Sequence, residues 1–181
     1  MKKIIFIFLF FLTQNLLGEV ATALTSGYVF KRGQIFKEVY GHGITNILTA
    51  DGCYYFQNNW GLGAKASYWR AHGQTTFLKQ TTLLQEVPAI FYLRKLCQRP
   101  SGTQLYASLG GGFTWVKENS YLGTVSIFRG LGELEIGCNY PVWRSWNVTA
   151  AARYLFPPQN QNGTKKDVGG VDLRAGIGFD W

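Results

Sequence analysis

The chain has 181 residues, a net charge of +8 from 18 Lys and Arg against 10 Asp and Glu, and only 15% charged residues. Soluble domains carry about 25% charged residues, and intrinsic disorder requires high charge with low hydrophobicity, so the composition excludes a disordered chain. The 16% aromatic residues and 22 glycines favour a single strand-rich domain over the Ala-, Glu-, Lys- and Leu-rich pattern of a helical bundle.

The N-terminal segment predicts a secretory signal peptide over residues 1–23. Residues 1–3 are basic (MKK), residues 4–12 form an unbroken apolar run, and small residues follow. This order is typical of a signal peptide, and cleavage is predicted after Gly18 or Ala23. An uncleaved anchor is less favoured, because the apolar run is shorter than the ~20 residues of a spanning helix.

Downstream, apolar and polar residues alternate with the period of two that is typical of strands. The alternation is without error from Val171 to Trp181. The same pattern predicts eight strands in all, over residues 24–32, 44–56, 60–68, 83–97, 105–115, 128–140, 146–156 and 171–181. Alternation alone does not separate a soluble sandwich from a membrane barrel.

The lengths of the links favour a barrel. Long links alternate with short ones in the order 33–43, 57–59, 71–82, 98–102, 116–127, 141–145 and 157–170. Transmembrane barrels have short turns on one side and longer loops on the other, and an even number of strands closes an up-and-down sheet. We therefore predict an all-β fold, an eight-stranded antiparallel up-and-down transmembrane β-barrel over residues 24–181.

Aromatic residues gather at the end of the predicted barrel that carries the short turns. They flank the first and third of these turns, at Tyr54, Phe56, Trp60, Tyr140, Trp143 and Trp146. Such rings sit at the lipid headgroup boundary of membrane barrels. From Trp60 to Tyr68 the chain covers roughly 20 Å along the membrane normal after a ~40° tilt, which matches an outer-membrane apolar band. A soluble β core with buried aromatics is the alternative.

The signal peptide, the alternating strands and the aromatic end of the last strand (Phe179 and Trp181) resemble the small outer-membrane β-barrel proteins of the OmpA, OmpX and OmpW type. The segments 26–30 and 35–41 are similar to the opening of many members of this group. The resemblance implies a location in the bacterial outer membrane and contact with outer-membrane lipid and lipopolysaccharide. It also implies that the outer-membrane assembly machinery recognises Phe179 and Trp181. The group shares a fold more than a function, and no oligomeric state is predicted.

Charged residues on the inward face predict a filled lumen, because eight strands leave room only for side chains and buried charges require partners. Pairing Phe56 with Trp60 sets Asp51 opposite Lys65, and pairing Tyr140 with Trp146 sets Glu133 opposite Arg153. The next hairpin lets Arg153 face Asp172. The predicted lumen charge network consists of Asp51, Lys65, Glu133, Glu135, Arg153, Asp172 and Arg174.

The predicted function is a non-enzymatic barrel with a structural or interactive role through its outer loops. A narrow channel for small or apolar solutes, as in OmpW-type barrels, is the alternative. A lipid-modifying barrel enzyme is less favoured, because the two histidines, His42 and His72, lie in or beside predicted loops without a nearby serine on a strand. Glu133 and Glu135 lie on one face as an acid/base pair would, but next to Arg153 and Arg174 a salt-bridged network is favoured.

No cofactor, metal site or nucleic-acid partner is predicted. Cys53, Cys97 and Cys138 form no C-x-x-C pair, so neither a zinc site nor a thioredoxin-type motif is indicated. The basic residues are scattered rather than gathered in one stripe, which does not fit a nucleic-acid interface.

Overall fold

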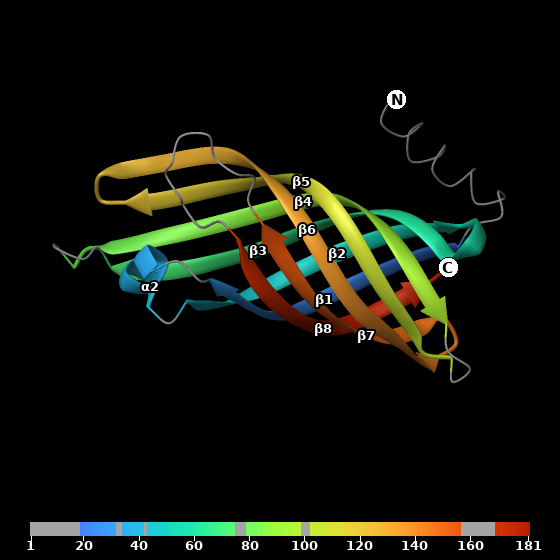
Figure 1. Ribbon diagram of the computed structural model, residues 1–181. Coiled ribbons are helices and arrows are strands. Elements are labelled where there is room, and N and C mark those ends of the chain that lie inside the picture. The colour runs from blue at the N-terminus through green and yellow to red at the C-terminus, as the bar shows by residue number, and fades with distance from the viewer. Residues whose placement is uncertain (1–18, 32–33, 42, 75–78, 99–101, 157–168) are drawn as a thin grey trace, which may run out of the picture.

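The computed structural model describes residues 19–31, 34–41, 43–74, 79–98, 102–156 and 169–181, so the predicted signal sequence up to Gly18 lies outside the described residues. Eight strands form one closed barrel, in which each strand pairs antiparallel with the next and β8 pairs with β1 (Figure 1). The strands are β1 (Glu19–Lys31), β2 (Ile44–Phe56), β3 (Trp60–Gln74), β4 (Thr81–Gln98), β5 (Gln104–Ser120), β6 (Gly123–Trp143), β7 (Trp146–Phe156) and β8 (Gly170–Asp180). The prediction of an eight-stranded up-and-down barrel is confirmed.

The alternation along each strand separates an outward from an inward face. In β7, Val148 and Tyr154 point outward and are exposed, whereas Thr149 and Arg153 are buried. The β2–β3 and β6–β7 turns and the C-terminus mark one end of the barrel, which we call the turn end (Figure 1). The opposite end is called the outer end. An apolar outward face with a polar inward face is the pattern of a membrane-spanning barrel.

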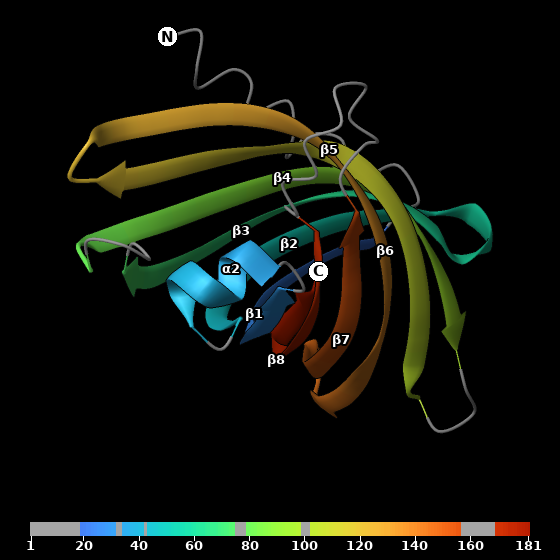
Figure 2. The same cartoon turned by 60° about the vertical axis from the view of Figure 1, so that its left-hand side comes forward.

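Strands β3 to β6 extend past the other four at the outer end (Figures 1 and 2). The β2–β3 pairing stops at Ile47 with Trp69, and the β6–β7 pairing stops at Gly132 with Phe156. The protruding part is a four-stranded sheet of residues 70–74, 81–85, 117–120 and 123–126. This part is called the outer sheet. Residues 123–131 of β6 are called the β6 margin, and among the described residues their strand partner is β5.

The prediction of a long link over residues 116–127 is wrong. Strands β5 and β6 continue through this segment and are joined by a tight turn at Tyr121 and Leu122, with Gly123 at a φ of 124°. The reason is physical: beyond the membrane neither face of a strand must be apolar, so the residues that alternate inside the bilayer no longer do so outside it. The strict alternation of long and short links therefore fails at this position.

The third short turn also differs from the prediction. Strand β6 continues to Trp143, and its register shifts between Pro141 and Trp143. Trp143 consequently pairs with Trp146, and Tyr140 pairs with Val148 rather than with Trp146. An irregularity of this kind moves every later partner along the strand.

A short helix lies inside the first long link and covers part of the outer end. Helix α2 (Gln34–Tyr40) sits at the mouth beside β1 to β3 (Figure 2). Phe36 and Tyr40 pack against a buried cluster of Val29, Ile47, Trp69 and Ala71. Among the described residues no helix is long and apolar enough to cross a bilayer.

The contact of α2 with the outer sheet depends on Gly73 and Tyr40. A Cβ atom at Gly73 would lie 2.3 Å from the carbonyl oxygen of Val39, so only glycine allows this approach. The Tyr40 hydroxyl donates a hydrogen bond of 2.9 Å to Glu118 Oε1 on β5. Burial raises the pKa of the Tyr40 hydroxyl, which keeps it protonated as the donor.

The first residues of β1 bear on the cleavage site of the signal peptide. Residues 19–23 pair with β2 from Tyr55 to Asp51, and Ala21–Ala23 pair with β8. Cleavage after Ala23 would remove five strand residues and open the seam of the barrel, so we expect cleavage after Gly18 and a mature N-terminus at Glu19. The intact mass of the protein purified from outer membranes measures this. A mass that begins at Leu24 in a barrel that still folds would contradict the expectation.

Candidate functional site in the barrel lumen

Buried charges of both signs fill the middle of the lumen. The four cations are Lys65, Arg94, Arg153 and Arg174, and the four carboxylates are Asp51, Glu133, Glu135 and Asp172. These eight residues, which come from β2, β3, β4, β6, β7 and β8, are called the central ion network. The four positive and four negative formal charges of the network cancel, because charges buried away from water need partners of opposite sign.

Glu135 is the most connected carboxylate of the central ion network. Its Oε2 lies 2.7 Å from Lys65 Nζ and contacts the guanidinium of Arg174, and its Oε1 lies 3.3 Å from Arg94 Nη2. Lys65 also reaches Glu133 Oε1 at 2.7 Å, so one ammonium group bridges two carboxylates. The Lys65, Glu133 and Glu135 side chains are all 0% exposed.

Arg153, on β7, pairs with two carboxylates of the network. Its Nε donates to Asp172 Oδ2 at 2.6 Å, and its Nη1 donates to Glu133 Oε2 at 3.4 Å. Arg174 Nε lies 2.9 Å from the other Asp172 oxygen. All seven residues of the predicted charge network therefore lie in one connected cluster.

The predicted pairing inside this cluster is partly wrong. Asp51 does stand opposite Lys65, and Arg153 opposite Asp172, as predicted. Glu133, however, pairs with Leu155, and it is Glu135 that stands opposite Arg153. The β6–β7 turn is tighter than predicted, because Trp143 pairs with Trp146, and the one-residue irregularity that follows leaves a net displacement of two positions. Parity is therefore unchanged, and both carboxylates still point inward.

Sequence reasoning missed Arg94 and its aromatic neighbours. The guanidinium carbon of Arg94 lies 4.6 Å from the Tyr92 ring and 4.2 Å from the Tyr106 ring, which is cation–π geometry. Arg94 Nη2 is 2.7 Å from Asp51 Oδ2, and the Tyr92 hydroxyl donates to Asp51 Oδ1. The signal was available, since Tyr92 and Arg94 share the parity of inward-facing Ile90.

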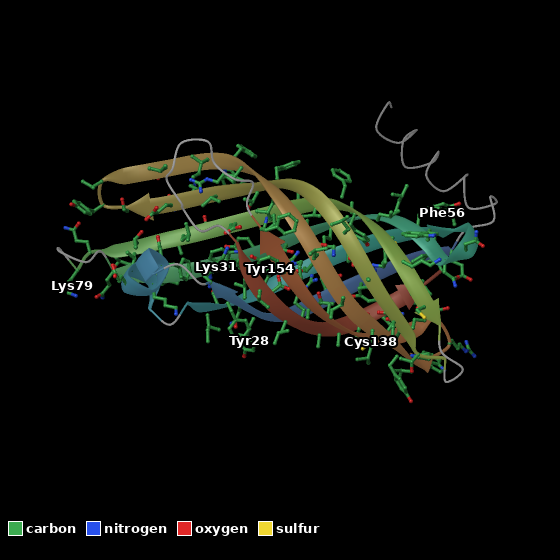
Figure 3. The ribbon with its side chains drawn as sticks, viewed as in Figure 1. Tyr28, Lys31, Phe56, Lys79, Cys138 and Tyr154 are labelled. Atoms are coloured by element: carbon green, nitrogen blue, oxygen red, sulfur yellow. The ribbon has the colours of Figure 1, made fainter. Side chains whose placement is uncertain are left out.

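A second buried ion pair lies nearer the outer end. Lys31 Nζ is 3.1 Å from Glu86 Oε2 and 4.6 Å from the centre of the Trp69 ring, and Thr114 donates to Glu86 Oε1 at 3.2 Å. Figure 3 labels Lys31 beside α2. A buried apolar cluster of Ile90, Leu131 and Leu155 also fills part of the lumen. The lumen is thus occupied by side chains at several levels.

The turn end contains a small polar cavity. Its walls include Asn139, Asn147, Thr149 and Asp180, and its volume is about 10 Å³. A cavity of roughly 10–15 Å³ holds about one water molecule. This volume does not provide a path for a solute.

The predicted interface aromatics lie at the turn end and point outward. Their exposed side chains are Tyr54, Phe56, Trp60, Tyr140, Trp143 and Trp146. Phe56 marks this end in Figure 3, and Lys79 marks the other. Phe179 continues the row, with its ring centre 5.0 Å from Trp146 and 4.9 Å from Trp181.

The described residues form no arrangement for catalysis. His42 lies outside them, and His72 is exposed on the outward face of β3. Glu133 and Glu135 both form ion pairs with Lys65.

Within the described part of the chain no group of His, Cys, Asp and Glu has the geometry of a metal site. Cys53 is buried, Cys97 and Cys138 lie on the outward face of β4 and β6, and all three are free.

Solved structures with the same architecture come from several bacteria. OprG, an outer membrane protein of Pseudomonas aeruginosa, is similar with a TM-score of 0.63 and 14% identity over 91% of this chain and 96% of that one. The chain has the fold of the small outer-membrane β-barrels. Neisserial surface protein A (NspA) is similar with a TM-score of 0.59 and 15% identity, over 89% of this barrel and 96% of that chain.

A third similar structure is Ail, the attachment invasion locus protein of Yersinia pestis, in complex with the heparin analogue sucrose octasulfate. Its TM-score is 0.58 at 15% identity, over 92% of this barrel and 100% of that chain. No family model and no curated protein matches the sequence. At these identities the likeness concerns the fold, and the residues of each barrel decide its function.

Proposed function

We propose that this protein is a non-enzymatic outer-membrane barrel with a filled lumen that binds an extended protein segment outside the cell, along the open margin of β6. The observation that carries the proposal is the composition of that margin. From Gly123 to Phe128 it contains no charged residue and no proline, and it includes β-branched Thr124, Val125 and Ile127. Leu122, Val125 and Phe128 are exposed by 81%, 60% and 72%.

Proteins normally protect such margins. Lysines, prolines, bulges or a covering segment block the free N–H and C=O groups that would otherwise pair with another chain. On the other margin of the outer sheet, α2 lies against β3. The β3 margin is covered, whereas the uncharged, β-branched segment 123–128 of β6 pairs, among the described residues, with β5 alone. This contrast supports strand addition at β6, in which a partner segment extends the sheet.

The lumen argues against the conduit alternative. A conducting pore needs a continuous open path, whereas the ion pairs of the central ion network join side chains from strands around the barrel across the lumen. The likeness to Ail adds modest support for an interactive role, because that protein is named for attachment. We also propose that the outward face of the barrel contacts outer-membrane lipid and lipopolysaccharide. Phe179 and Trp181 are proposed as the signal that the outer-membrane assembly machinery recognises.

Adding positive charge to the β6 margin tests the proposal. The double change Thr124→Lys and Ser126→Lys places lysines on the open strand and is expected to reduce binding by about tenfold or more, because charged margins resist strand addition. The measurement is the adhesion of cells displaying the protein to surfaces coated with extracellular-matrix proteins.

The matched control is Thr81→Lys with Asn119→Lys, which adds the same charge to the outer sheet on β4 and β5. Thr81 pairs with Gln74 on β3, and Asn119 pairs with Leu83 on β4 and with Thr124 on the β5 side of β6. Neither lysine is added to the side of β6 that would receive the partner segment, so the control is expected to bind like the wild type. Equal adhesion of the margin variant and the wild type, or equal loss in both variants, would overturn strand addition at β6.

A further inference from the structure

The outward face of the barrel carries very few charges. Along the described strands, the outward-facing positions include three charged side chains, and all are basic: Arg70 on β3, Lys95 on β4 and Lys117 on β5. Lys95 belongs to the turn end, where its Nζ lies 4.9 Å from the Trp60 ring centre and donates to the carbonyl of Asn58. Arg70 and Lys117 belong to the outer end.

Arg70 and Lys117 stand in one row across three strands. Arg70 pairs with Gln85, and Gln85 pairs with Lys117, so the two cations are separated by two strand spacings, about 10 Å. Gln85 Nε2 donates to the Tyr68 hydroxyl at 3.2 Å, which places Gln85 on the outward face. Among the described residues neither Arg70 nor Lys117 forms an ion pair, whereas each lumen cation of the central ion network does.

An apolar groove of about 390 Å³ lies on the same strands, nearer the middle of the membrane. Its floor is made of small side chains, Ala50, Ala64, Ala66 and Ala89, and Phe91 and Phe113 form one wall. Ladder pairing between β3 and β4 is interrupted beside it, between the Ala66–Ala89 and Trp69–Glu86 pairs. Pro88 lies in this gap, and proline has no N–H to donate.

The two cations and the groove lie within the length of one lipid molecule. Arg70 follows Ala66 by four positions, about 13 Å along the strand. An anionic headgroup at Arg70 and Lys117 would therefore leave an acyl chain at the level of the groove. The absence of any outward acidic side chain on the described strands makes this face complementary to phosphate.

We propose that Arg70 and Lys117 bind the two phosphates of an outer-leaflet glycolipid, the lipid A part of lipopolysaccharide, and that one of its acyl chains lies in the groove of Ala50, Ala64, Ala66 and Ala89. Two separate cations about 10 Å apart suit a headgroup with two phosphates better than a phospholipid with one. The site lies on the outward face, from the first row of the outer sheet down to the groove, and is independent of strand addition at β6.

The proposed contact of Arg70 and Lys117 with the headgroup is tested by binding of diphosphoryl lipid A to the barrel in phosphatidylcholine nanodiscs. Native mass spectrometry measures the binding. Arg70→Gln with Lys117→Gln is expected to bind about tenfold more weakly than the wild type. Lys95→Gln with Arg144→Gln removes the same charge at the turn end and is expected to bind like the wild type. Equal weakening in both variants, or no weakening in the first, would overturn the site.

Two further arms test the lipid source and the groove. Phosphatidylglycerol is expected to bind the wild type about tenfold more weakly than diphosphoryl lipid A, and equal affinity would overturn the glycolipid assignment. Ala66→Leu fills the groove and is expected to weaken binding of diphosphoryl lipid A severalfold. Its control, Ala150→Leu, changes an outward alanine on β7 away from the groove and is expected to have no effect. Equal affinities of Ala66→Leu and Ala150→Leu would overturn the acyl-chain half.

Discussion

Replacing Glu135 by glutamine is expected to lower the free energy of unfolding by about 3–5 kcal/mol. Glu135 neutralises Lys65, Arg94 and Arg174 in a part of the lumen where its own side chain is 0% exposed. Without its charge the central ion network keeps four cations against three carboxylates, and at least one cation stays buried without full compensation. The measurement is urea unfolding in lipid vesicles, followed by tryptophan fluorescence and by the mobility of unboiled protein on gels.

Two variants make this result specific. Glu118→Gln is the matched control, since Glu118 is exposed on the outer sheet and accepts hydrogen bonds from Tyr40 and Thr82 without an ion pair among the described residues. A change below about 1 kcal/mol is therefore expected. Adding Lys65→Met to Glu135→Gln restores the balance of charge and is expected to recover part of the lost stability. If Glu135→Gln and Glu118→Gln are equally stable, the lumen is hydrated rather than filled.

The same variants separate a plug from a pore. The wild-type barrel is expected to show no steady conductance in planar bilayers, because the ion pairs of the central ion network occupy the lumen. A steady wild-type conductance whose ion selectivity changes in Arg153→Glu, without a loss of stability, would favour the channel.

The inward charges were predictable because the face of a strand residue depends only on parity. Glu133, Glu135 and Arg153 reached the lumen although their register was wrong, since a shift by two positions leaves parity unchanged. The pairing itself depended on the tight turn that pairs Trp143 with Trp146 and on the irregularity beside it, and alternation reveals neither. A charge exchange between Glu133 and Arg153 would consequently not restore the network, because it places an arginine beside Lys65 and a glutamate beside Asp172.

The outer sheet and α2 were missed for a different reason. Outside the membrane the bilayer no longer imposes an apolar outward face, so Lys117, Glu118 and Asn119 appear as a polar loop in the sequence although they continue β5. Helix α2 is too short for a periodic pattern, and its place is decided by contacts of Phe36 and Tyr40 with distant strands. Such long-range contacts are what local patterning omits.

The second large effect is expected at Gly63, where the lumen wall meets an aromatic side chain. A Cβ atom at this position would lie 2.3 Å from Tyr92 Cζ and 2.5 Å from the carbonyl oxygen of Gly52, and real Cβ atoms do not approach so closely. Gly63→Ala therefore has to displace Tyr92, which is 3% exposed. The displaced ring loses its hydrogen bond to Asp51 and its contact with the Lys65 ammonium group, 4.4 Å from the ring centre.

Gly63→Ala is expected to destabilise the barrel by about 3 kcal/mol, the sum of overpacking and of a lost hydrogen bond to a charged group. Gly52→Ala is the matched control, because a Cβ at Gly52 meets no atom within 4 Å, and it is expected to leave the stability within about 0.5 kcal/mol of the wild type. In a Tyr92→Ala background the ring is absent, so Gly63→Ala is expected to have a smaller effect there, as urea unfolding of the four proteins would measure. An unchanged effect of Gly63→Ala in that background would show that the conflict is with the backbone of β2 and not with Tyr92.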